Sequence, residues 1–332
     1  MRVLAAVLAL WGLSGCGGKG SLPPTPAGLP VGEAVRECGR FDADSAYAYV
    51  EKQVSFGARV PNTSAHRACG DFFVETLRRH GAEVKEQEME VEAYDGKVLR
   101  ARNIVGVYGR EARRRVLLCA HWDSRPFADQ DEDVLRQRRP VEGADDGASG
   151  CGVLLEIARQ LGQHEAAVGV DIVLFDAEDY GVPEFEKERY GGGGWCLGSQ
   201  YWAKHPHAKD YRAEYGILLD MVGGRGAVFF KEWASVRRGG KVVEKVWGAA
   251  RQLGYGRYFV DVEGGAITDD HVYVMEGRGF PCIDIINYDP ESATGFGSHW
   301  HTDGDNLGVI EKETLGAVGE TVLSVVYGEK DW

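Results

Sequence analysis

Four apolar segments, separated from one another by helical patterns, constrain the fold of this chain more than any other feature. They are RVLLCAH (115–121), GVDIVLF (169–175), YGILLD (215–220) and FPCIDIINY (280–288). Strands that stay apolar without alternation are buried on both faces, which is typical of largely parallel sheets covered by helices on both sides. The sequence therefore predicts an α/β fold, a three-layer sandwich with a mixed, mostly parallel central sheet flanked by helices.

Helical spacing occupies most of the chain between these strands. Thr63 or Ser64 is a suitable residue to cap a helix that precedes them. The segment EVKEQEMEVEAY (83–94) alternates polar and apolar residues, as a half-exposed strand does. A single catalytic α/β domain over 41–332 accounts for this order of elements. Helices are expected in two pieces from 42 to 80, and at 147–164, 198–206, 241–255, 269–279 and 312–328.

Length and charge narrow the class of function. The chain has 332 residues, with 51 acidic and 38 basic side chains and a formal net charge of −13. A nucleic-acid surface needs clustered Lys and Arg, so we expect no nucleic-acid partner. We further expect the chain to act as a monomer.

The first forty residues predict export. Residues 1–15 combine one Arg, an apolar stretch and small residues, which is the pattern of a secretory signal peptide too short to span a bilayer. The ending LSGC resembles a bacterial lipoprotein cleavage box, so Cys16 would become the acylated first residue, and ordinary secretion is the alternative. Residues 16–40 then form a flexible tether. We expect a cell-envelope lipoprotein, by analogy on the periplasmic side of the outer membrane, whose only membrane contact is its lipid anchor.

Six further cysteines are able to pair in an exported protein. The sequence does not choose among the possible disulfide patterns. No CxxC spacing occurs, so a structural zinc knuckle is not expected. Disulfides or small buried side chains are the expected roles of Cys38, Cys69, Cys119, Cys151, Cys196 and Cys282.

Three of the apolar strands run directly into polar residues. Their continuations contain HWDS, DAED and DMVG, and SHWHTD (298–303) follows the last strand. Ligands of parallel sheets bind beyond the carboxyl ends of the strands, so these side chains are expected to converge. Asp176, Glu178 and Asp179 would be costly to bury together unless a cation neutralises part of their charge.

The residue types in this cluster indicate a metal ion. Imidazoles together with carboxylates in an exported protein favour zinc over magnesium, because imidazole suits the softer ion. Each residue taken alone has an ordinary alternative, such as a helix cap for the acids of GADDGASG (143–150). Their convergence is what points to a site. The candidate ligands are His121, Asp146, Asp179, Asp220 and His301.

Five motifs, in this order, resemble those of a known family: AHWDSRPFAD, GADDGASG, FDAEDYG, LLDMVGG and SHWHT. The set resembles the zinc aminopeptidase superfamily and, within it, the bacterial, animal-type glutaminyl cyclases, over residues 40–328. The resemblance implies a zinc aminopeptidase-like α/β domain. It also implies zinc-dependent cyclisation of the N-terminal glutaminyl residue of peptides or proteins to pyroglutamate, with release of ammonia.

The resemblance implies roles for the polar residues of the cluster. Asp146, Asp179 and His301 match the ligands of one zinc ion, although Asp179 stands where the family often has the longer Glu. Glu178 matches the general base and acid of the reaction. Asp269, together with Asp220, resembles the acidic pair that holds the substrate nitrogens, and a cap of the following helix is the alternative for Asp269.

Aromatic residues near these motifs are expected to line the substrate pocket. Trp300 and Phe296 resemble pocket walls of the family. Trp195, within GGGGWCLGS (191–199), is either a third wall or a buried structural residue.

His121 leaves a second reading of the site open. It belongs to the same superfamily pattern and could complete a second zinc site with Asp220 and a shared Asp146. Two zinc ions would suit an aminopeptidase that hydrolyses the first peptide bond, which is the main alternative function. TDDH (268–271) and the Trp before the last ligand are more similar to the cyclases, so we expect one zinc ion. A non-catalytic binding module is a further alternative, although Glu178 and the three core ligands are all present.

Overall fold

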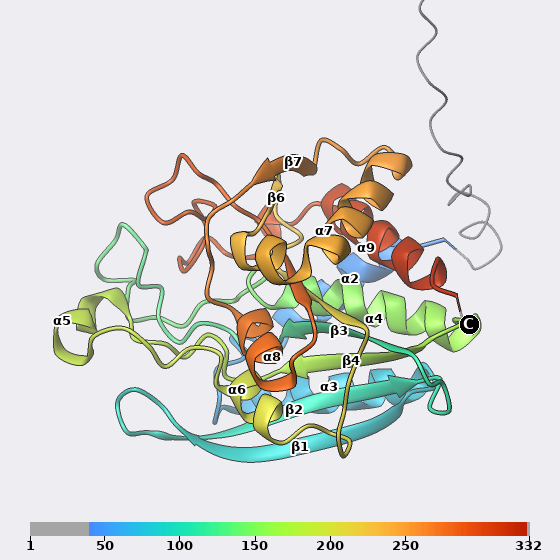
Figure 1. Ribbon diagram of the computed structural model, residues 1–332. Coiled ribbons are helices and arrows are strands. Elements are labelled where there is room, and N and C mark those ends of the chain that lie inside the picture. The colour runs from blue at the N-terminus through green and yellow to red at the C-terminus, as the bar shows by residue number, and fades with distance from the viewer. Residues whose placement is uncertain (1–39, 331–332) are drawn as a thin grey trace, which may run out of the picture. The chain divides into compact units, whose positions relative to one another are not determined.

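The computed structural model describes residues 40–330, and a six-stranded sheet lies at the centre of them. Its strands are β1 (Glu83–Glu92), β2 (Val98–Tyr108), β3 (Arg115–His121), β4 (Gly169–Phe175), β5 (Tyr215–Asp220) and β8 (Cys282–Ile286). They lie in the order β1-β2-β4-β3-β5-β8 (Figure 1). β4, β3, β5 and β8 pair in parallel, whereas β2 pairs in antiparallel with both β1 and β4. The predicted mixed, mostly parallel sheet is confirmed.

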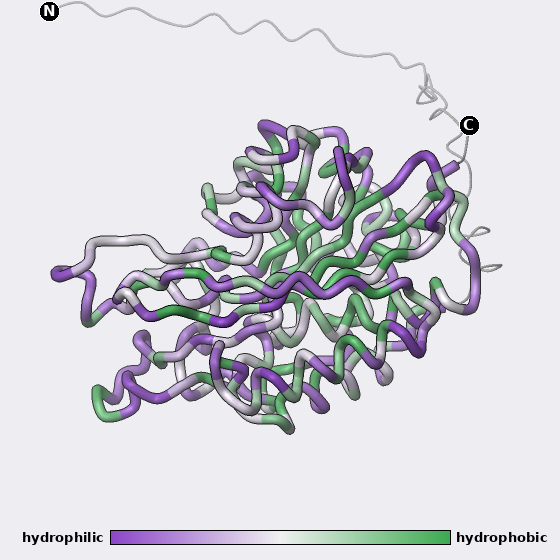
Figure 2. The backbone as a smooth tube through the Cα atoms, turned by 90° about the horizontal axis from the view of Figure 1, so that it is seen from below, coloured by the Kyte–Doolittle hydropathy of each residue, from purple (hydrophilic) through white to green (hydrophobic). Residues whose placement is uncertain are grey.

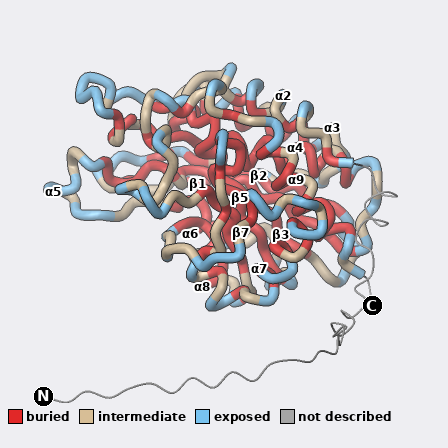
Figure 3. Tube along the Cα trace, turned by 90° about the horizontal axis from the view of Figure 1, so that it is seen from above, coloured by how far each residue is buried: buried red, intermediate tan, exposed pale blue. Residues whose placement is uncertain are grey.

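Helices cover both faces of this sheet. On β3, Val116 and Leu118 pack into one hydrophobic core and Leu117 and Cys119 into another, because successive side chains of a strand point to opposite faces. The chain through the central strands is largely hydrophobic (Figure 2) and buried (Figure 3). The first core takes residues from α2 (Ala43–Val54), α3 (Ser64–Arg79), α4 (Ala148–Gln163), α7 (Trp233–Leu253) and α9 (Lys312–Tyr327). The second takes residues from α6 (Leu197–Lys204) and α8 (Asp270–Arg278).

The start of α7 differs from the prediction. The helix begins at Trp233, upstream of the predicted start at 241. The glycine pair of RRGG does not end it, because Gly239 takes the non-helical values φ −132 and ψ 23 and the helix passes through a kink. The carboxylate of Glu232 caps the earlier start by accepting hydrogen bonds from the N–H groups of Ala234 and Ser235.

Several short elements were not predicted. β6 (Phe229–Lys231) and β7 (Phe259–Glu263) form a second, two-stranded parallel sheet. A three-residue strand is too short to show a periodic pattern, which is why the sequence did not reveal it. Two single-turn 3-10 helices (Glu184–Glu186 and Leu307–Val309) and α5 (Lys187–Tyr190) complete the described elements, and α5 lies in an exposed segment (Figure 3).

Cysteines and membrane contacts were open points of the sequence. The five cysteines at 69, 119, 151, 196 and 282 are buried free thiols, so they form no disulfides with one another. Cys16 and Cys38, with the predicted signal peptide and nearly all of the tether, lie outside the described residues. Among residues 40–330 no helix combines the length and the apolar character needed to cross a bilayer.

The strand register brings the predicted polar residues to one edge of the sheet. His121 lies opposite Phe175, so the end of β3 is level with the end of β4. Cys119 lies opposite Leu218, and two residues further along each strand are His121 and Asp220. The ends of β3, β4 and β5 therefore lie side by side at one edge of the sheet, and the loops that follow them lie around the same site.

Candidate metal centre

All five predicted ligands converge at the carboxyl edge of the sheet. His121 and Asp220 are the last residues of β3 and β5, Asp179 follows β4, Asp146 precedes α4, and His301 comes from the loop after β8. The five side chains are buried, with at most 7% of any residue exposed. Titratable side chains from three strand ends and two loops are therefore gathered in one place that is largely shielded from water.

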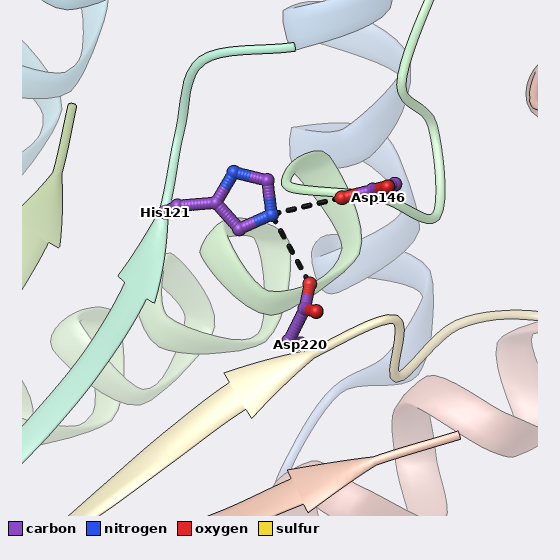
Figure 4. A group of neighbouring side chains, drawn as sticks. All are labelled: His121, Asp146 and Asp220. Carbon is purple, nitrogen blue, oxygen red and sulfur yellow. Dashed lines mark hydrogen bonds and ion pairs between the residues drawn. The ribbon is translucent and has the colours of Figure 1, made fainter. Parts of the chain in front are cut away.

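The ligands form two groups that share Asp146. In the first group, His301 Nε2 lies 3.1 Å from Asp179 Oδ1 and 3.6 Å from Asp146 Oδ2. In the second, His121 Nε2 lies 2.9 Å from Asp146 Oδ1 and 3.1 Å from Asp220 Oδ1 (Figure 4). Within each group the ligand atoms all lie within 4.8 Å of one another.

The first group has the properties of a metal site. Both carboxylate oxygens of Asp179 are buried and have no hydrogen-bond partner among the described residues. An unpaired buried carboxylate is costly, and a cation removes the cost. One imidazole and two carboxylates, with room for a further ligand, form a donor set that zinc accepts in catalytic sites. Asp179, one methylene shorter than the family's usual Glu, still reaches His301, so the residues present fit zinc.

His301 is oriented by a carboxylate that the sequence analysis did not single out. Its Nδ1 lies 3.4 Å from Asp129 Oδ1, and Asp129 accepts two hydrogen bonds of 3.0 Å from the guanidinium of Arg125. Arg125 also donates to the main-chain oxygens of Asp179 and Gly181 at 2.9 Å. A carboxylate behind a ligand histidine fixes the orientation and tautomer of the ring. One buried Arg–Asp pair thus connects two predicted ligands.

A second acid outside the predicted set aligns the turn after β4. Asp123 accepts hydrogen bonds from the N–H groups of Glu178 and Asp179, at 3.0 and 3.2 Å, and its Oδ1 lies 3.5 Å from His121 Nδ1. Asp176 anchors the same turn: it accepts hydrogen bonds from the N–H groups of Arg102 and Ala177. The turn that carries Glu178 is therefore held on both sides by carboxylates that have partners of their own.

The backbone is strained at several residues of this centre. Residues other than glycine rarely adopt positive φ, which concentrates at functional sites when the surrounding structure enforces it. Ala177 (φ 54) lies between Asp176 and Glu178, Met221 (φ 48) follows Asp220, and the ligand His301 itself has φ 54. The strained backbone positions of the centre are therefore at, or next to, its candidate functional residues.

Asp145, next to the ligand Asp146, has a structural role. The sequence left open whether it caps the following helix. α4 begins after Gly147 without a side-chain cap, so the helix-cap alternative is wrong. Asp145 Oδ1 instead accepts from the N–H of Gly223 at 2.8 Å, and its Oδ2 lies 2.8 Å from His299 Nε2. It joins three loops around the centre.

A cavity of about 170 Å³ opens onto the first metal group. The three aromatic residues proposed as walls, Trp195, Phe296 and Trp300, all line it. Trp300 stacks on the imidazole of His301 with ring centroids 3.7 Å apart, and Trp195 lies parallel to the same ring at 5.8 Å. Trp195 is therefore a wall and not only a buried structural residue.

The remaining predicted residues also line the cavity: Glu178, Asp220 and Asp269. Glu178, Asp269 and the thiol of Cys196 place side-chain atoms within 4.8 Å of one another. Burial raises the pKa of Glu178 well above its usual range; His121 opposes the rise and Asp269 and Asp179 add to it. Asp269 also accepts a hydrogen bond from the N–H of Asp270 as the cap of α8, so the helix-cap alternative is confirmed, and the same residue lines the cavity. The arrangement offers a proton acceptor beside a metal group.

Comparison with known proteins places this geometry in a family. The model of Peptidase family M28 matches residues 103–326. A Zn-dependent exopeptidase from Parabacteroides distasonis has 60% sequence identity and a TM-score of 0.87, over 88% of this chain and 100% of that chain. The glutaminyl cyclase of Tannerella forsythia has 59% identity and a TM-score of 0.86 over the same shares.

A curated relative extends the likeness to animals. The bovine glutaminyl-peptide cyclotransferase is 25% identical over 236 residues, which cover 64% of this chain and 62% of the bovine protein. The matched stretch thus spans less than two thirds of that relative. The predicted family, fold and zinc cofactor are confirmed by these matches together with the candidate metal groups. The chain belongs to peptidase family M28, in the zinc-dependent branch that contains the bacterial glutaminyl cyclases.

Proposed function

We propose that this protein converts the N-terminal glutaminyl residue of peptides or proteins into pyroglutamate and ammonia. One observation carries the proposal: a single small cavity holds the Asp146–Asp179–His301 group, Glu178 and the acids Asp220 and Asp269. Its volume of about 170 Å³ lies below the range of about 300–1,000 Å³ typical of ligand pockets. A cavity of this size suits one folded side chain better than a length of peptide. The likeness to solved glutaminyl cyclases supports the same reaction.

Zinc would be held by Asp146, Asp179 and His301, and would supply a Lewis acid that polarises the side-chain amide of the substrate. Glu178 accepts a proton from the attacking α-amine and returns it to the departing amide nitrogen, which leaves as ammonia. The amine of the substrate attacks its own amide carbon, so the main task of the pocket is to hold the side chain folded back.

Other residues of the cavity position the substrate and exclude water. Asp220 and Asp269 present carboxylate oxygens that accept hydrogen bonds from the amine and amide N–H groups. Trp195, Phe296 and Trp300 surround the apolar part of the side chain and keep water from competing for the amide. A pocket whose aromatic walls shield the amide from water favours cyclisation over hydrolysis.

One zinc ion per chain is part of the proposal. His121 Nε2 forms a hydrogen bond of 3.1 Å with Asp220 Oδ1, so two side chains of the second group already have a hydrogen-bond partner within the group. Asp179, in the first group, has no such bond from any described residue. The aminopeptidase alternative needs both groups filled, and the comparisons do not support it better than the cyclase.

Ammonia release from Gln-peptides tests the reaction directly. The purified protein, with zinc per chain measured by elemental analysis, is given Gln-peptides and, in parallel, a leucine anilide. We expect ammonia and pyroglutamyl peptide from the first and little product from the second, with one zinc bound. Release of free amino acid without ammonia, from a protein holding two zinc ions, would establish the aminopeptidase.

We further propose that the protein is an exported, Cys16-acylated monomer of the cell envelope, on the periplasmic side of the outer membrane. The LSGC box ahead of the tether supports the lipid anchor. Cys16→Ala should move the protein from the membrane fraction to the soluble fraction of the envelope. The oligomeric state is measured by sedimentation of a protein that lacks residues 1–15 and carries no lipid, and we expect a monomer.

A further inference from the structure

Cys196 lies directly against the carboxylate proposed as the catalytic base. Its Sγ is 3.0 Å from Glu178 Oε1, and the residue is fully buried. Its main-chain N–H donates to the main-chain oxygen of Glu178 at 2.8 Å, and the N–H of Leu197 donates to that of Ala177 at 3.0 Å. Cys196 thus holds both the backbone and the side chain of Glu178.

The backbone of Cys196 is left-handed, with φ 57 and ψ 34, at the start of α6. This conformation costs an ordinary residue about 1–2 kcal/mol, and glycine adopts it freely. The four residues from 191 to 194 are all glycine, so this part of the chain is rich in the residue that would relieve the strain. A side chain kept at such a position indicates that the side chain itself has a task.

The left-handed turn also directs two neighbouring side chains to the two halves of the centre. Trp195 stacks against the ligand His301, with the guanidinium of Arg125 at 4.5 Å from the centre of its ring. The next residue, Cys196, contacts Glu178. The Trp195–Cys196 pair therefore connects the base with a metal ligand: Trp195 lines the cavity, whereas Cys196 contacts Glu178 and does not line it.

The thiol is the one side chain in residues 40–330 whose hydrogen bond to the Glu178 carboxylate is resolved. Of the other ionisable neighbours, Asp269 and Asp179 repel the carboxylate, and His121 attracts it through its charge without a resolved hydrogen bond to it. We infer that Cys196 is a positioning residue of the reaction: its S–H donates to Glu178 Oε1 and fixes the direction in which the base meets the substrate amine. This inference rests on the proposed function for the identity of the reaction.

A thiol suits this task because it is a weak donor. A Lys or Arg at this position would form an ion pair, which lowers the basicity of a carboxylate. The neutral thiol orients the carboxylate and leaves its proton affinity nearly intact. Burial raises the pKa of Cys196 well above its usual range, and Glu178 adds to the rise, so the donor hydrogen stays in place.

Three substitutions of Cys196 separate orientation from folding. In Cys196→Ala the carboxylate loses its donor, and we expect kcat on a Gln-peptide to fall about tenfold, because general base catalysis contributes about 10²–10⁴ and only its orientation is impaired. KM and zinc content should stay as in the wild type. Cys196→Ser restores a donor and should recover kcat to within about threefold of the wild type.

Cys196→Gly is the decisive variant. Glycine accepts φ 57 without strain, so this protein should unfold at a temperature no lower than Cys196→Ala, yet its kcat should be as low. The matched control is Cys69→Ala, which removes another buried thiol from the core next to α3 and should leave kcat unchanged. A purely structural role for Cys196 would instead make kcat follow thermal stability across the series.

Wild-type kcat in Cys196→Ala, or an equal loss in the Ser and Ala variants, would overturn the inference. Its failure is distinguishable from failure of the proposed function. If the wild type releases no ammonia from Gln-peptides but hydrolyses a leucine anilide, the cyclase assignment is wrong, and the same four variants measured on the anilide still test whether the thiol orients Glu178.

Discussion

The two ends of β4 hold buried carboxylates in opposite situations. Asp171, within the strand, accepts two hydrogen bonds from the guanidinium of Arg115, at 2.6 and 2.7 Å, and one from the Tyr211 hydroxyl at 2.9 Å. Asp179, four residues beyond the strand, is just as buried, but neither of its oxygens accepts a hydrogen bond from the described residues. A carboxylate matched by its own chain holds the fold together, whereas one left unmatched in the same sheet marks the place of a ligand.

The same distinction divides the acids that follow β4. Asp176 has main-chain donors and the imidazole of His66 at 2.9 Å, and so resembles Asp171. Asp179 faces His301 and the other ligand acids, and Glu178 has the thiol of Cys196 as its resolved donor. Under the proposed function, three acids within four positions of the sequence serve three purposes: anchoring a turn, moving a proton and binding a metal.

Replacing Asp179 should have the largest effect on activity. Asp179→Asn removes a ligand, and since the Lewis acid contributes several kcal/mol we expect turnover to fall by about 10³-fold or more, with zinc lost by elemental analysis. Measured by urea unfolding in the presence of a chelator, the variant should be more stable than the wild type by about 1–3 kcal/mol, because the wild type buries a charge that accepts no hydrogen bond and that Asp146 repels. If the variant kept zinc, or were less stable than the wild type without zinc, Asp179 would be a structural carboxylate like Asp171 and not a metal ligand.

Replacing Glu178 should separate chemistry from metal binding. Glu178→Gln keeps the shape of the side chain and removes its basicity, so kcat should fall by about 10²–10⁴ while zinc content is unchanged. His301→Ala, as the matched control, should lose the metal along with the activity. Activity retained in Glu178→Gln would mean that another group takes the proton from the amine.

Replacing Asp171 should have the opposite signature. Asp171→Asn leaves the half-buried Arg115 without its anionic partner, so the free energy of unfolding should fall by up to about 3–5 kcal/mol. Zinc content and kcat of the folded protein should remain those of the wild type, because Asp171 lies at the far end of β4 from the metal groups. If the loss of stability were below about 1 kcal/mol, the pair would be no stronger than a surface salt bridge.

The sequence predicted the metal centre better than its supports. Apolar strands that end in His or Asp are visible in the sequence as a pattern. Because β4, β3 and β5 are neighbours in a parallel sheet, the residues at their ends lie close together. Asp129 gave no such signal, because it lies in an irregular loop and acquires its partner only when distant segments fold together. Asp123 belongs to the polar HWDS segment, but its hydrogen bonds to the turn after β4 depend on that turn folding against it. Arg125 had the same difficulty, although RPFAD belonged to one of the five motifs.

Local geometry was the other limit of prediction. Gly239 lies just before the predicted helix start at 241 and is a kink within α7. Cys196 looked like one of several packing thiols and has a left-handed backbone against the base. Both outcomes depend on the contacts of neighbouring elements and not on local propensity. Asp145 illustrates the same point, since a position suited to capping α4 is used to bind Gly223 and His299.

The smallest expected effect is a pH dependence of stability at the Asp171 end. The side chain of His207 accepts a hydrogen bond from Trp202 at 3.2 Å and lies 3.8 Å from Asp171 Oδ1. Burial lowers the pKa of His207 to about 4, an effect that Asp171 opposes. The unfolded chain takes up a proton near the ordinary pKa of 6.5 and the folded chain does not, so stability is present above 6.5 and is lost as the pH falls toward 4. From pH 7 to 5.5 this residue should cost about 1 kcal/mol of unfolding free energy.

Urea unfolding at several pH values, in wild type and in His207→Asn, isolates that contribution. Both proteins are measured with chelator present, so that proton release from the metal ligands on zinc binding does not enter the difference. The curve for His207→Asn should be flatter between pH 7 and 5.5 by the amount that His207 contributes. Parallel curves would show that His207 is solvated well enough to titrate normally. The cluster around Asp171 would then be less completely closed to water than the metal centre at the other end of the strand.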